Sequence, residues 1–213
     1  MLWLSVVILV TVLQVVGSLQ RVPTRVVVSG GCHGNELTGV WVLSRLQQRA
    51  AAIAEAYPML RVETLLANPR AHADNVRFID CDLNRQFSQA ALIAPPESYR
   101  SRSMGIDFGR YETTRAREIS AKFGPKGAEA QAADLCIDLH TTTANMGCTL
   151  IVGSWCHPAL AAASYVAQQW LRGDDRVAQS FPLRVLIDPH HSKEDCPYLC
   201  SVARHGIEIE VGL

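Results

Sequence analysis

Apolar residues along the chain follow two patterns, one typical of buried strands and one typical of amphipathic helices. The β-branched run at 26–28, which is followed by Gly30 and Gly31, predicts a strand over 24–29 that is buried on both faces. From about 36 to 54 the apolar residues recur at helical spacing with polar residues between them, which predicts a helix. By the same criteria we expect strands over 61–67, 134–140, 148–152, 183–187 and 206–211, and helices over 111–123 and 159–170.

The alternation of strands with helices indicates the class of fold. It predicts an open α/β sheet with helices on both faces. The chain has 213 residues, of which 48% are hydrophobic, and this suffices for one domain with its own core but not for two domains of ordinary size. Twenty basic and 20 acidic residues give a net charge of zero, so we expect no nucleic-acid partner.

The beginning of the chain differs in composition from the rest. Residues 1–20 carry no charged side chain and residues 2–16 are mostly apolar, which is typical of a signal peptide or a short membrane anchor. No basic side chain precedes this run, and the run is short and interrupted, so a signal peptide, an anchor and a non-native start all stay open. If it is an anchor, Arg21 and Arg25 would hold the rest of the chain in the cytosol. We therefore divide the chain into a leader over 1–20, through which alone a membrane contact is expected, and one domain over 21–213.

The cysteines are expected to be free thiols. The chain has 7 of them, an odd number without tight paired spacing, in a sequence with enough apolar residues to form a core. Cys196 and Cys200 have the spacing of half a zinc knuckle, but no second pair matches them. We expect the thiols to be mostly buried.

A candidate metal site lies where the first predicted strand ends. His33 and Glu36 flank a strand-to-helix junction, and the carboxyl ends of strands are where α/β sheets bind ligands. His140, at the end of the strand predicted over 134–140, can supply a third ligand. Two imidazoles and one carboxylate leave a fourth position open, as in catalytic zinc sites. Taken singly, the His33 and Glu36 pair is common by chance, and His140 is equally a residue that caps a strand end.

Asp138 is expected to support this site. It lies two residues before His140, so the two side chains point to the same face of the strand. Its carboxylate can accept the ring N–H of His140 and fix the orientation of the imidazole.

Four segments of the chain resemble the aspartoacylase family, which belongs with the zinc carboxypeptidase-like hydrolases. They are GGCHGNELTGV at 30–40, IDCDLNR at 79–85, DLHTTTANMG at 138–147 and IEVG at 209–212. The resemblance spans 24–213 and leaves out the leader. It implies a three-layer α/β/α fold with a mixed central sheet, one zinc ion, a small-molecule N-acyl amino acid substrate and a cytoplasmic location, and it leaves a homo-oligomer open.

The resemblance also implies catalytic roles. In the family, the residues that match His33, Glu36 and His140 bind zinc. The match to Glu210 is the general base, which takes a proton from the attacking water and hands it to the leaving amine. The match to Arg77 polarises the scissile carbonyl. Without the resemblance, Arg77 would be taken for a solvated loop arginine, and Glu210 would be a carboxylate in an apolar strand that needs a partner.

Substrate-binding roles follow from the same motifs. Asn84 and Arg85 match the pair that grips the α-carboxylate of the substrate, for which a guanidinium fork is suited. Asp82 lies between Arg77 and this pair, and we expect it to orient them. Without the resemblance, Arg85 too would be taken for a solvated loop residue.

Three departures limit what the resemblance implies. Thr141 follows the third zinc ligand where the family has Asn, so a hydroxyl replaces an amide there. Cys200 stands where the animal enzymes carry an arginine that reads the aspartate side-chain carboxylate, unless Arg204 or Lys193 takes that part. The sequence ends at Leu213, whereas family members continue for roughly another hundred residues, so we expect a truncated domain without the C-terminal small domain.

The first expectation is therefore a zinc-dependent amidohydrolase that cleaves N-acetyl-L-aspartate to acetate and L-aspartate. The alternative, which Cys200 favours, keeps the zinc chemistry and acts on N-acyl-aromatic or succinyl-amino-acid substrates. A third possibility is a truncated, inactive fragment. The leader leaves a membrane-anchored or secretory location open beside the cytoplasmic one.

Overall fold

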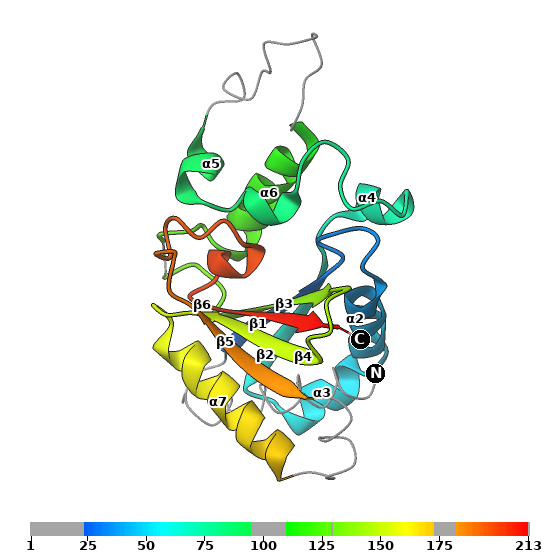
Figure 1. Ribbon diagram of the computed structural model, residues 1–213, viewed down its shortest axis with the longest axis vertical. Helices are drawn as coiled ribbons and strands as arrows, with labels where there is room; N and C mark the ends of the chain where they lie inside the picture. The colour runs from blue at the N-terminus through cyan, green and yellow to red at the C-terminus, as the bar shows by residue number, and fades with distance from the viewer. Residues whose placement is uncertain (1–23, 95–109, 129, 173–181, 213) are drawn as a thin grey trace.

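The computed structural model describes residues 24–94, 110–128, 130–172 and 182–212. The leader expected over 1–20 lies outside these ranges, and within them no helix is long and apolar enough to cross a membrane. At the centre is a six-stranded sheet with the strand order β2-β1-β3-β6-β4-β5 (Figure 1). The strands are β1 (Thr24–Gly30), β2 (Leu60–Leu66), β3 (Leu135–Thr141), β4 (Cys148–Gly153), β5 (Leu183–Asp188) and β6 (His205–Val211).

The sheet is mixed, as the sequence led us to expect. Strands β2, β1, β3 and β6 run parallel to one another, β4 pairs antiparallel with β6, and β5 pairs parallel with β4. The ends of all six predicted strands agree with the structure to within one residue. The agreement has a physical reason, because β1 and β3 are central strands whose apolar residues are covered on both faces.

Helices cover both faces of the sheet and complete the three-layer α/β/α arrangement (Figure 1). On one face, α2 and α7 pack against apolar side chains of β1, β3, β4 and β6. On the other face, α6 packs together with the two 3-10 turns η1 and η3. The helical elements are α2 (Leu37–Gln48), α3 (Ala50–Ala56), α4 (Pro69–Ala73), η1 (Leu83–Arg85), α5 (Gln89–Ile93), α6 (Arg110–Phe123), α7 (His157–Leu171) and η3 (Leu199–Val202).

Alternation along the strands decides which face receives the polar groups. On β3, Leu135, Ile137 and Leu139 join the core beneath α2 and α7. Asp138 and His140 therefore point to the opposite face, which α6 covers. Strand β6 repeats this alternation, so Glu208 and Glu210 both point to the face that α6 covers. The polar side chains thus gather near the carboxyl ends of the central strands, on the α6 side.

Two local predictions differ from the structure. The pattern over 36–54 predicted one helix, but the chain forms α2 and α3, which meet at Arg49 (φ −107°, ψ 10°). Helix α3 has no fully buried residue, and its Ile53 packs against the core from a partly buried position, so little packing holds it in line with α2. The segment after β2, for which the sequence predicted no helix, contains α4. Its start follows from Asn68, whose side chain caps Ala71, and from Pro69, which has no N–H to lose in the first turn.

The cysteines are free thiols, as predicted. All seven lie in the described part of the chain, and six of them are buried. Within that part, neither group of side chains that could hold a metal ion includes Cys196 or Cys200.

Candidate active site

Three side chains from two distant parts of the sequence meet at the carboxyl end of the sheet. His33 follows β1, Glu36 is the N-cap residue of α2, and His140 lies near the end of β3. Oε1 of Glu36 lies 2.7 Å from Nδ1 of His33, and Oε2 lies 3.0 Å from Nδ1 of His140. One ligand atom from each residue lies within 4.8 Å of the other two. The structure thus brings together the three predicted metal ligands, which we call the metal cluster.

Glycines allow the chain to turn sharply between β1 and Glu36. Gly31 has a φ of 67°, a conformation that residues with a Cβ rarely adopt. A Cβ on Gly34 would lie 2.0 Å from the backbone carbonyl carbon of Ala71, so the approach of these two segments requires glycine. The turn brings His33 and Glu36 to the same side of the sheet.

A second carboxylate holds the outer nitrogen of each imidazole. Nε2 of His140 lies 2.9 Å from Oδ2 of Asp138, which is the pairing expected from their spacing. Nε2 of His33 lies 3.0 Å from Oδ1 of Asp82. These contacts orient both rings so that Nδ1 faces the shared carboxylate at the centre of the metal cluster.

Thr141 takes part through its backbone. Its N–H donates to Oε2 of Glu36 at 3.0 Å. Its Oγ1 is buried and has no hydrogen-bond partner among the described residues. The hydroxyl therefore does not take over the contacts of the amide that the family carries at this position.

The electrostatics of the metal cluster favour an ionised Glu36. Burial alone would raise the pKa of Glu36, but hydrogen bonds to His140 and His33 lower it to about 2. Burial also opposes protonation of His33, yet hydrogen bonds to Asp82 and Glu36 raise its pKa. The pKa of the buried His140 is raised as well, chiefly by the charge of Asp138. An ionised carboxylate between two imidazoles is a donor set that suits zinc.

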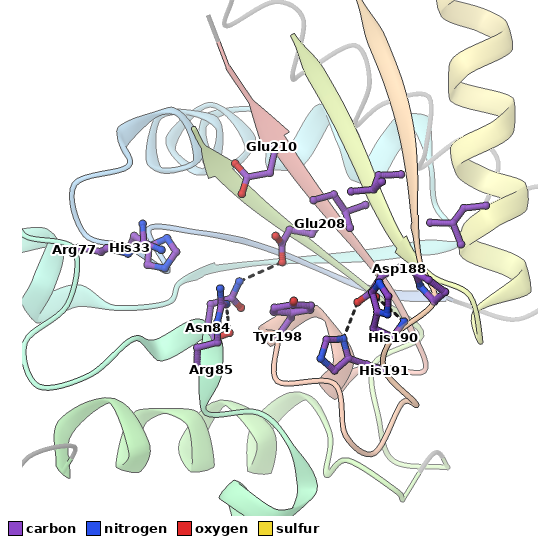
Figure 2. Close-up of a pocket in the computed structure, with 14 residues that line it drawn as sticks. His33, Arg77, Asn84, Arg85, Asp188, His190, His191, Tyr198, Glu208 and Glu210 are labelled. Carbon is purple, nitrogen blue, oxygen red and sulfur yellow. Dashed lines mark hydrogen bonds and ion pairs between the residues drawn. The ribbon is translucent and has the colours of Figure 1, made fainter. Parts of the chain in front are cut away.

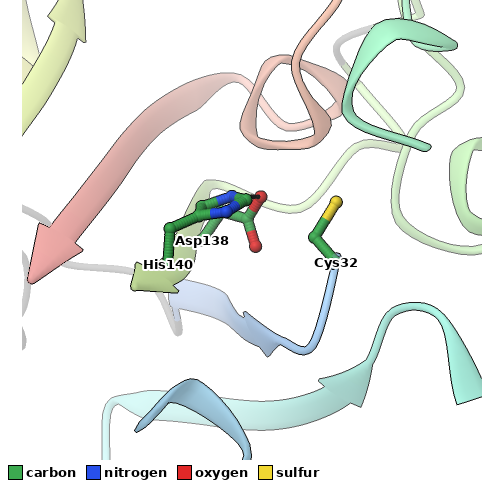
Figure 3. Close-up of side chains that lie close together, drawn as sticks. All are labelled: Cys32, Asp138 and His140. Atoms are coloured by element: carbon green, nitrogen blue, oxygen red, sulfur yellow. Dashed lines mark hydrogen bonds and ion pairs between the residues drawn. The ribbon is translucent and has the colours of Figure 1, made fainter. Parts of the chain in front are cut away.

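A second group of donor atoms shares His140. Cys32, Asp138 and His140 are all buried and lie close together (Figure 3). Burial, reinforced by the charge of Asp138, raises the pKa of Cys32 well above its ordinary value, so the thiol stays protonated and is a poor ligand. Asp138 is also already in use on the outer nitrogen of His140. The group around Glu36 therefore fits a metal better.

A cleft of about 360 Å³ adjoins the metal cluster, which is within the range of small-molecule sites. Figure 2 shows its lining side chains, which come from the β1–α2 turn, from the segment around η1, and from β4, β5 and β6 with the loop after β5. The polar ones are His33, Arg77, Asn84, Arg85, Asp188, His190, His191, Tyr198, Glu208 and Glu210, and the apolar ones are Ile151, Leu186, Ile187 and Pro189.

Glu210 projects from β6 into this cleft (Figure 2). In the sheet it is the register partner of His140, which places it next to the metal cluster. Burial raises the pKa of Glu210 to about 7. Its Oε2 is buried and has no hydrogen-bond partner among the residues that the structure describes. A carboxylate in this state is suited to take up and release a proton near neutral pH.

Both predicted arginines line the cleft (Figure 2). Arg77 donates from Nη1 to Glu36 at 3.4 Å and from Nη2 to Asp82 at 3.2 Å, so its guanidinium lies at the edge of the metal cluster. Arg85 donates from Nη1 to a backbone carbonyl at 2.8 Å, and its Cζ lies 5.2 Å from the ring centre of Tyr198. The two guanidinium groups therefore border the cleft at different points.

Asn84 and Asp82 are placed differently from one another. Asn84 lines the cleft but is only 2% exposed, and its amide is in use. Its Oδ1 accepts a backbone N–H of η3 at 2.8 Å, and its Nδ2 donates to Glu208 at 3.2 Å. Asp82 does not line the cleft, and it accepts the backbone N–H of Asn84 at 2.9 Å while contacting His33 and Arg77. The geometry thus places Asp82 as a residue that orients its neighbours.

Sequence reasoning missed Glu208 and Tyr198. Glu208 lies two positions before Glu210, so the period of a strand places both on one face, and this spacing could have found it. Burial raises the pKa of Glu208, although the charge of His140 and the hydrogen bond from Asn84 act in the opposite direction. Tyr198 had no comparable signal, because it lies in an irregular segment before η3.

The segment around Cys200 brings no cation to the cleft. Cys200 is buried in the core beneath α6. Arg204 forms an ion pair with Asp134 at 3.1 Å, and Nζ of Lys193 donates to the backbone carbonyl of Arg204 at 3.3 Å. Neither Arg204 nor Lys193 is among the residues that line the cleft.

Comparisons with known sequences identify relatives of the chain. The N-acyl-aromatic-L-amino acid amidohydrolase (carboxylate-forming) A of Danio rerio is 35% identical over 187 residues, which cover 88% of this chain and 52% of that protein. The aspartoacylase of Rattus norvegicus is 43% identical over 128 residues, which cover 60% of this chain and 37% of that protein. The chain spans about half the length, or less, of these curated relatives.

Comparisons with solved structures and with family models complete the assignment. The crystal structure of murine aminoacylase 3 matches with a TM-score of 0.71 at 32% identity, over 91% of this chain and 57% of that one. A metallo-carboxypeptidase from Burkholderia cenocepacia matches with a TM-score of 0.54 at 12% identity, which shows the expected carboxypeptidase-like fold alone. Residues 23–212 match the model of the succinylglutamate desuccinylase/aspartoacylase catalytic domain. Because this match covers nearly the whole chain, the chain belongs to the succinylglutamate desuccinylase/aspartoacylase family.

Proposed function

We propose that the chain is a zinc-dependent amidohydrolase that acts on N-acyl amino acids with apolar or aromatic side chains. The observation that carries this proposal is the convergence of His33, Glu36 and His140 beside Glu210 at one end of a cleft. Family membership supports the same reaction class.

The donor set of the metal cluster fits zinc. Two imidazole nitrogens and one carboxylate face a common point, and the outer nitrogens of both rings are fixed by further carboxylates. Three protein ligands leave room for water and substrate, as in catalytic zinc sites. Bound there, zinc would act as a Lewis acid toward the scissile carbonyl and would lower the pKa of water.

Hydrolysis of an amide needs a base and then an acid, and Glu210 is placed to serve as both. Its raised pKa, about 7, lets the carboxylate accept a proton from water as the water oxygen bonds to the acyl carbon. The same proton then passes to the amide nitrogen as the C–N bond breaks, and the second proton of the water passes from the new carboxyl group to the freed amine. A carboxylate product and a free amino acid result, and Glu210 returns to its ionised state.

Arg77 is the candidate for stabilising negative charge on the carbonyl oxygen. Contacts with Glu36 and Asp82 fix its guanidinium at the edge of the metal cluster. Its side chain remains 48% exposed, so other N–H donors of the group stay open to the cleft. Preorganised donors of this kind stabilise a developing oxyanion.

Arg85 is the candidate for holding the α-carboxylate of the substrate. Its guanidinium borders the cleft and stacks near Tyr198, which limits its motion. A planar fork of N–H donors matches a carboxylate in two-point fashion. The amide of Asn84, by contrast, is engaged with Glu208, so we assign the carboxylate to Arg85 first.

The cleft favours an apolar or aromatic side chain over aspartate, which replaces the first expectation from the sequence. Among the described residues, the lysines and arginines that line it are Arg77 and Arg85, and both have other roles. The wall beyond β6 includes the apolar residues Ile151, Leu186 and Ile187, which Asp188 and the loop after β5 continue. A relative named for N-acyl-aromatic substrates aligns with 88% of the chain, which is compatible with this substrate class.

Hydrolysis of a panel of N-acetyl amino acids by the purified full-length chain tests the proposal. We expect kcat/KM for N-acetyl-L-phenylalanine to exceed that for N-acetyl-L-aspartate by about tenfold or more, measured as release of the free amino acid. A preference for N-acetyl-L-aspartate would contradict the proposed substrate class. Absence of turnover across the panel, with a folded and zinc-loaded chain, would contradict the reaction itself.

A further inference from the structure

A row of register-paired residues crosses the sheet beneath the cleft. Asp138 on β3 pairs with Glu208 on β6. Glu208 pairs with Ile151 on β4, and Ile151 pairs with Leu186 on β5. Register partners on neighbouring strands point to the same face. The row therefore runs from the metal cluster, where Asp138 orients His140, to the apolar edge of the cleft.

Glu208 is the charged residue in the part of this row that lines the cleft. Ile151 and Leu186 line the cleft with it, whereas Asp138 does not. Glu208 is 8% exposed, so little water surrounds its carboxylate. The donor that holds its Oε2, at 3.2 Å, is the uncharged amide of Asn84 (Figure 2). This donor is neutral, so the hydrogen bond leaves the negative charge of the carboxylate in place, while the charges of His140 and Arg85 act on it through space.

We propose that Glu208 determines specificity by excluding substrates whose amino-acid side chain is anionic. This inference rests on the proposed function and deepens it. A substrate side chain that starts at the scissile bond, next to Glu210, and extends toward Ile151 and Leu186 has to pass Glu208. An aromatic or aliphatic side chain can pack along this path, whereas a carboxylate would meet a like charge there.

The repulsion is large enough to decide between substrates. For two charges roughly 6 Å apart and an effective dielectric constant of about 20, it corresponds to about a hundredfold weaker binding. Salt and residual water screen the repulsion and reduce the expected weakening of binding to about tenfold. Discrimination of this kind arises from a repulsive element as much as from attractive contacts.

A binding cycle that varies one charge on the ligand and one on the protein tests the proposal. N-acetyl-L-aspartate and N-acetyl-L-asparagine have nearly the same shape but differ by one negative charge, and Glu208→Gln removes one from the protein. Dissociation constants are measured by calorimetry on the zinc-loaded full-length chain carrying Glu210→Gln, so that the ligands are not consumed. With Glu208 present, we expect the asparagine ligand to bind about tenfold more tightly, and with Gln at 208 we expect the ratio to fall within about twofold.

Glu118→Gln is the matched control, because it removes the same charge from a side chain on α6 that is 58% exposed and outside the cleft lining. It should leave the ratio unchanged. Equal affinities in the presence of Glu208, or a ratio that Glu208→Gln and Glu208→Ala both leave intact, would overturn the proposal. The comparison of the two ligands needs no substitution at 208, so equal affinities overturn the proposal even if these variants do not fold. If the affinity ratio is tenfold and falls in Glu208→Gln, but the chain with Glu210 intact hydrolyses no N-acyl amino acid, the result supports charge exclusion and refutes the proposed reaction.

Discussion

Among single residues, Glu210 has the most specific assignment. Replacing it with Gln keeps the shape of the side chain but removes its ability to accept a proton. Glu210→Gln should lower kcat by about 10²- to 10⁴-fold, because general base catalysis contributes that much. The zinc content should not change, since Glu210 is not part of the metal cluster. Turnover close to that of the unsubstituted chain would refute the base role, and metal analysis of the same sample shows whether the metal cluster is intact.

The pH dependence of the reaction follows from the same residue. Burial holds the pKa of Glu210 at about 7, above the ordinary value of a glutamate. Only the ionised form can accept a proton, so kcat/KM should rise about tenfold per pH unit on the acid side and then level off. The positive charge of a bound metal lowers the pKa of a nearby carboxylate, so the midpoint should lie at or below about 7. A kcat/KM that falls as the pH rises through this range would be incompatible with a general base.

The elevated pKa of Glu210 also carries a stability cost. A carboxyl group whose pKa is higher in the folded chain than in the unfolded chain stabilises the fold below its unfolded pKa, and this contribution is lost as the pH rises toward about 7. Above that pH, Glu210→Gln should therefore stabilise the metal-free chain, by about 1 kcal/mol after allowance for solvent screening. Urea unfolding of both metal-free chains below and above this pH measures the difference. A variant that is less stable than the parent at high pH would contradict the burial argument.

Among the elements, α2 matters most for the site, because its N-cap residue is Glu36. Gly39 lets α2 approach the sheet closely, and a Cβ there would lie 2.8 Å from the carbonyl oxygen of Leu139 and 3.0 Å from Cα of Gly30. Gly39→Ala should therefore push α2 away, destabilise the fold by about 1–3 kcal/mol and weaken metal binding. Ser44→Ala, at an exposed position of the same helix, is the control and should change neither property. Chemical unfolding measures the stability of the two variants, and zinc titration measures their metal affinity. Full zinc affinity in Gly39→Ala would disprove the link between the position of α2 and the metal cluster.

Helix α6 positions the segment that carries Arg77 and Asp82. The carboxylate of Glu112 is fully buried and accepts the backbone N–H groups of Ile79, Asp80 and Cys81, at 2.6, 2.9 and 3.2 Å. Glu112→Gln turns one acceptor oxygen into a donor that faces these donors, so it should cost about 1–3 kcal/mol of stability. Chemical denaturation measures this cost, with Glu118→Gln as the control on the exposed face of the same helix. Equal stability of the two variants would show that the segment does not depend on Glu112.

Local patterns predicted the elements well, for reasons visible in the structure. Five of the six strands bury apolar side chains, so their sequences carry the signal that we used, whereas β5 lies at the edge of the sheet and buries no residue. The break at Arg49 and the start of α4 at Pro69 depend on packing and capping that act over a few residues, and they were missed. The metal cluster was predicted because His33, Glu36 and His140 each lie at the end of a predicted element.

At the scale of the whole molecule, the order of the strands could not be read from the sequence. Strand β6 inserts between β3 and β4, which pairs residues far apart in the chain. This insertion places Glu208 between the metal cluster and the apolar wall at Ile151. Local periodicity does not encode such pairing, so the first substrate expectation rested on the family motifs. The alternative rested on Cys200, which the structure places in the core.

Metal binding should also stabilise the whole fold. The ligands come from the segments after β1 and at the end of β3, and the unfolded chain does not hold them together. Removal of zinc with a chelator should lower the melting temperature, because about 2.7 kcal/mol is lost when ligand at a hundredfold excess over its dissociation constant is withdrawn. Differential scanning calorimetry with and without chelator measures the shift. His33→Ala should melt at the same temperature in both conditions, and a shift in that variant would place the metal elsewhere.

The most direct test combines zinc content with hydrolysis of N-acetyl-L-phenylalanine on one purified sample of the full-length chain. We predict one zinc ion per chain, turnover that disappears when the metal is removed, and recovery when zinc is restored. Turnover that survives complete removal of the metal, or a folded chain that binds no zinc, would contradict the assignment of His33, Glu36 and His140 as the catalytic metal site.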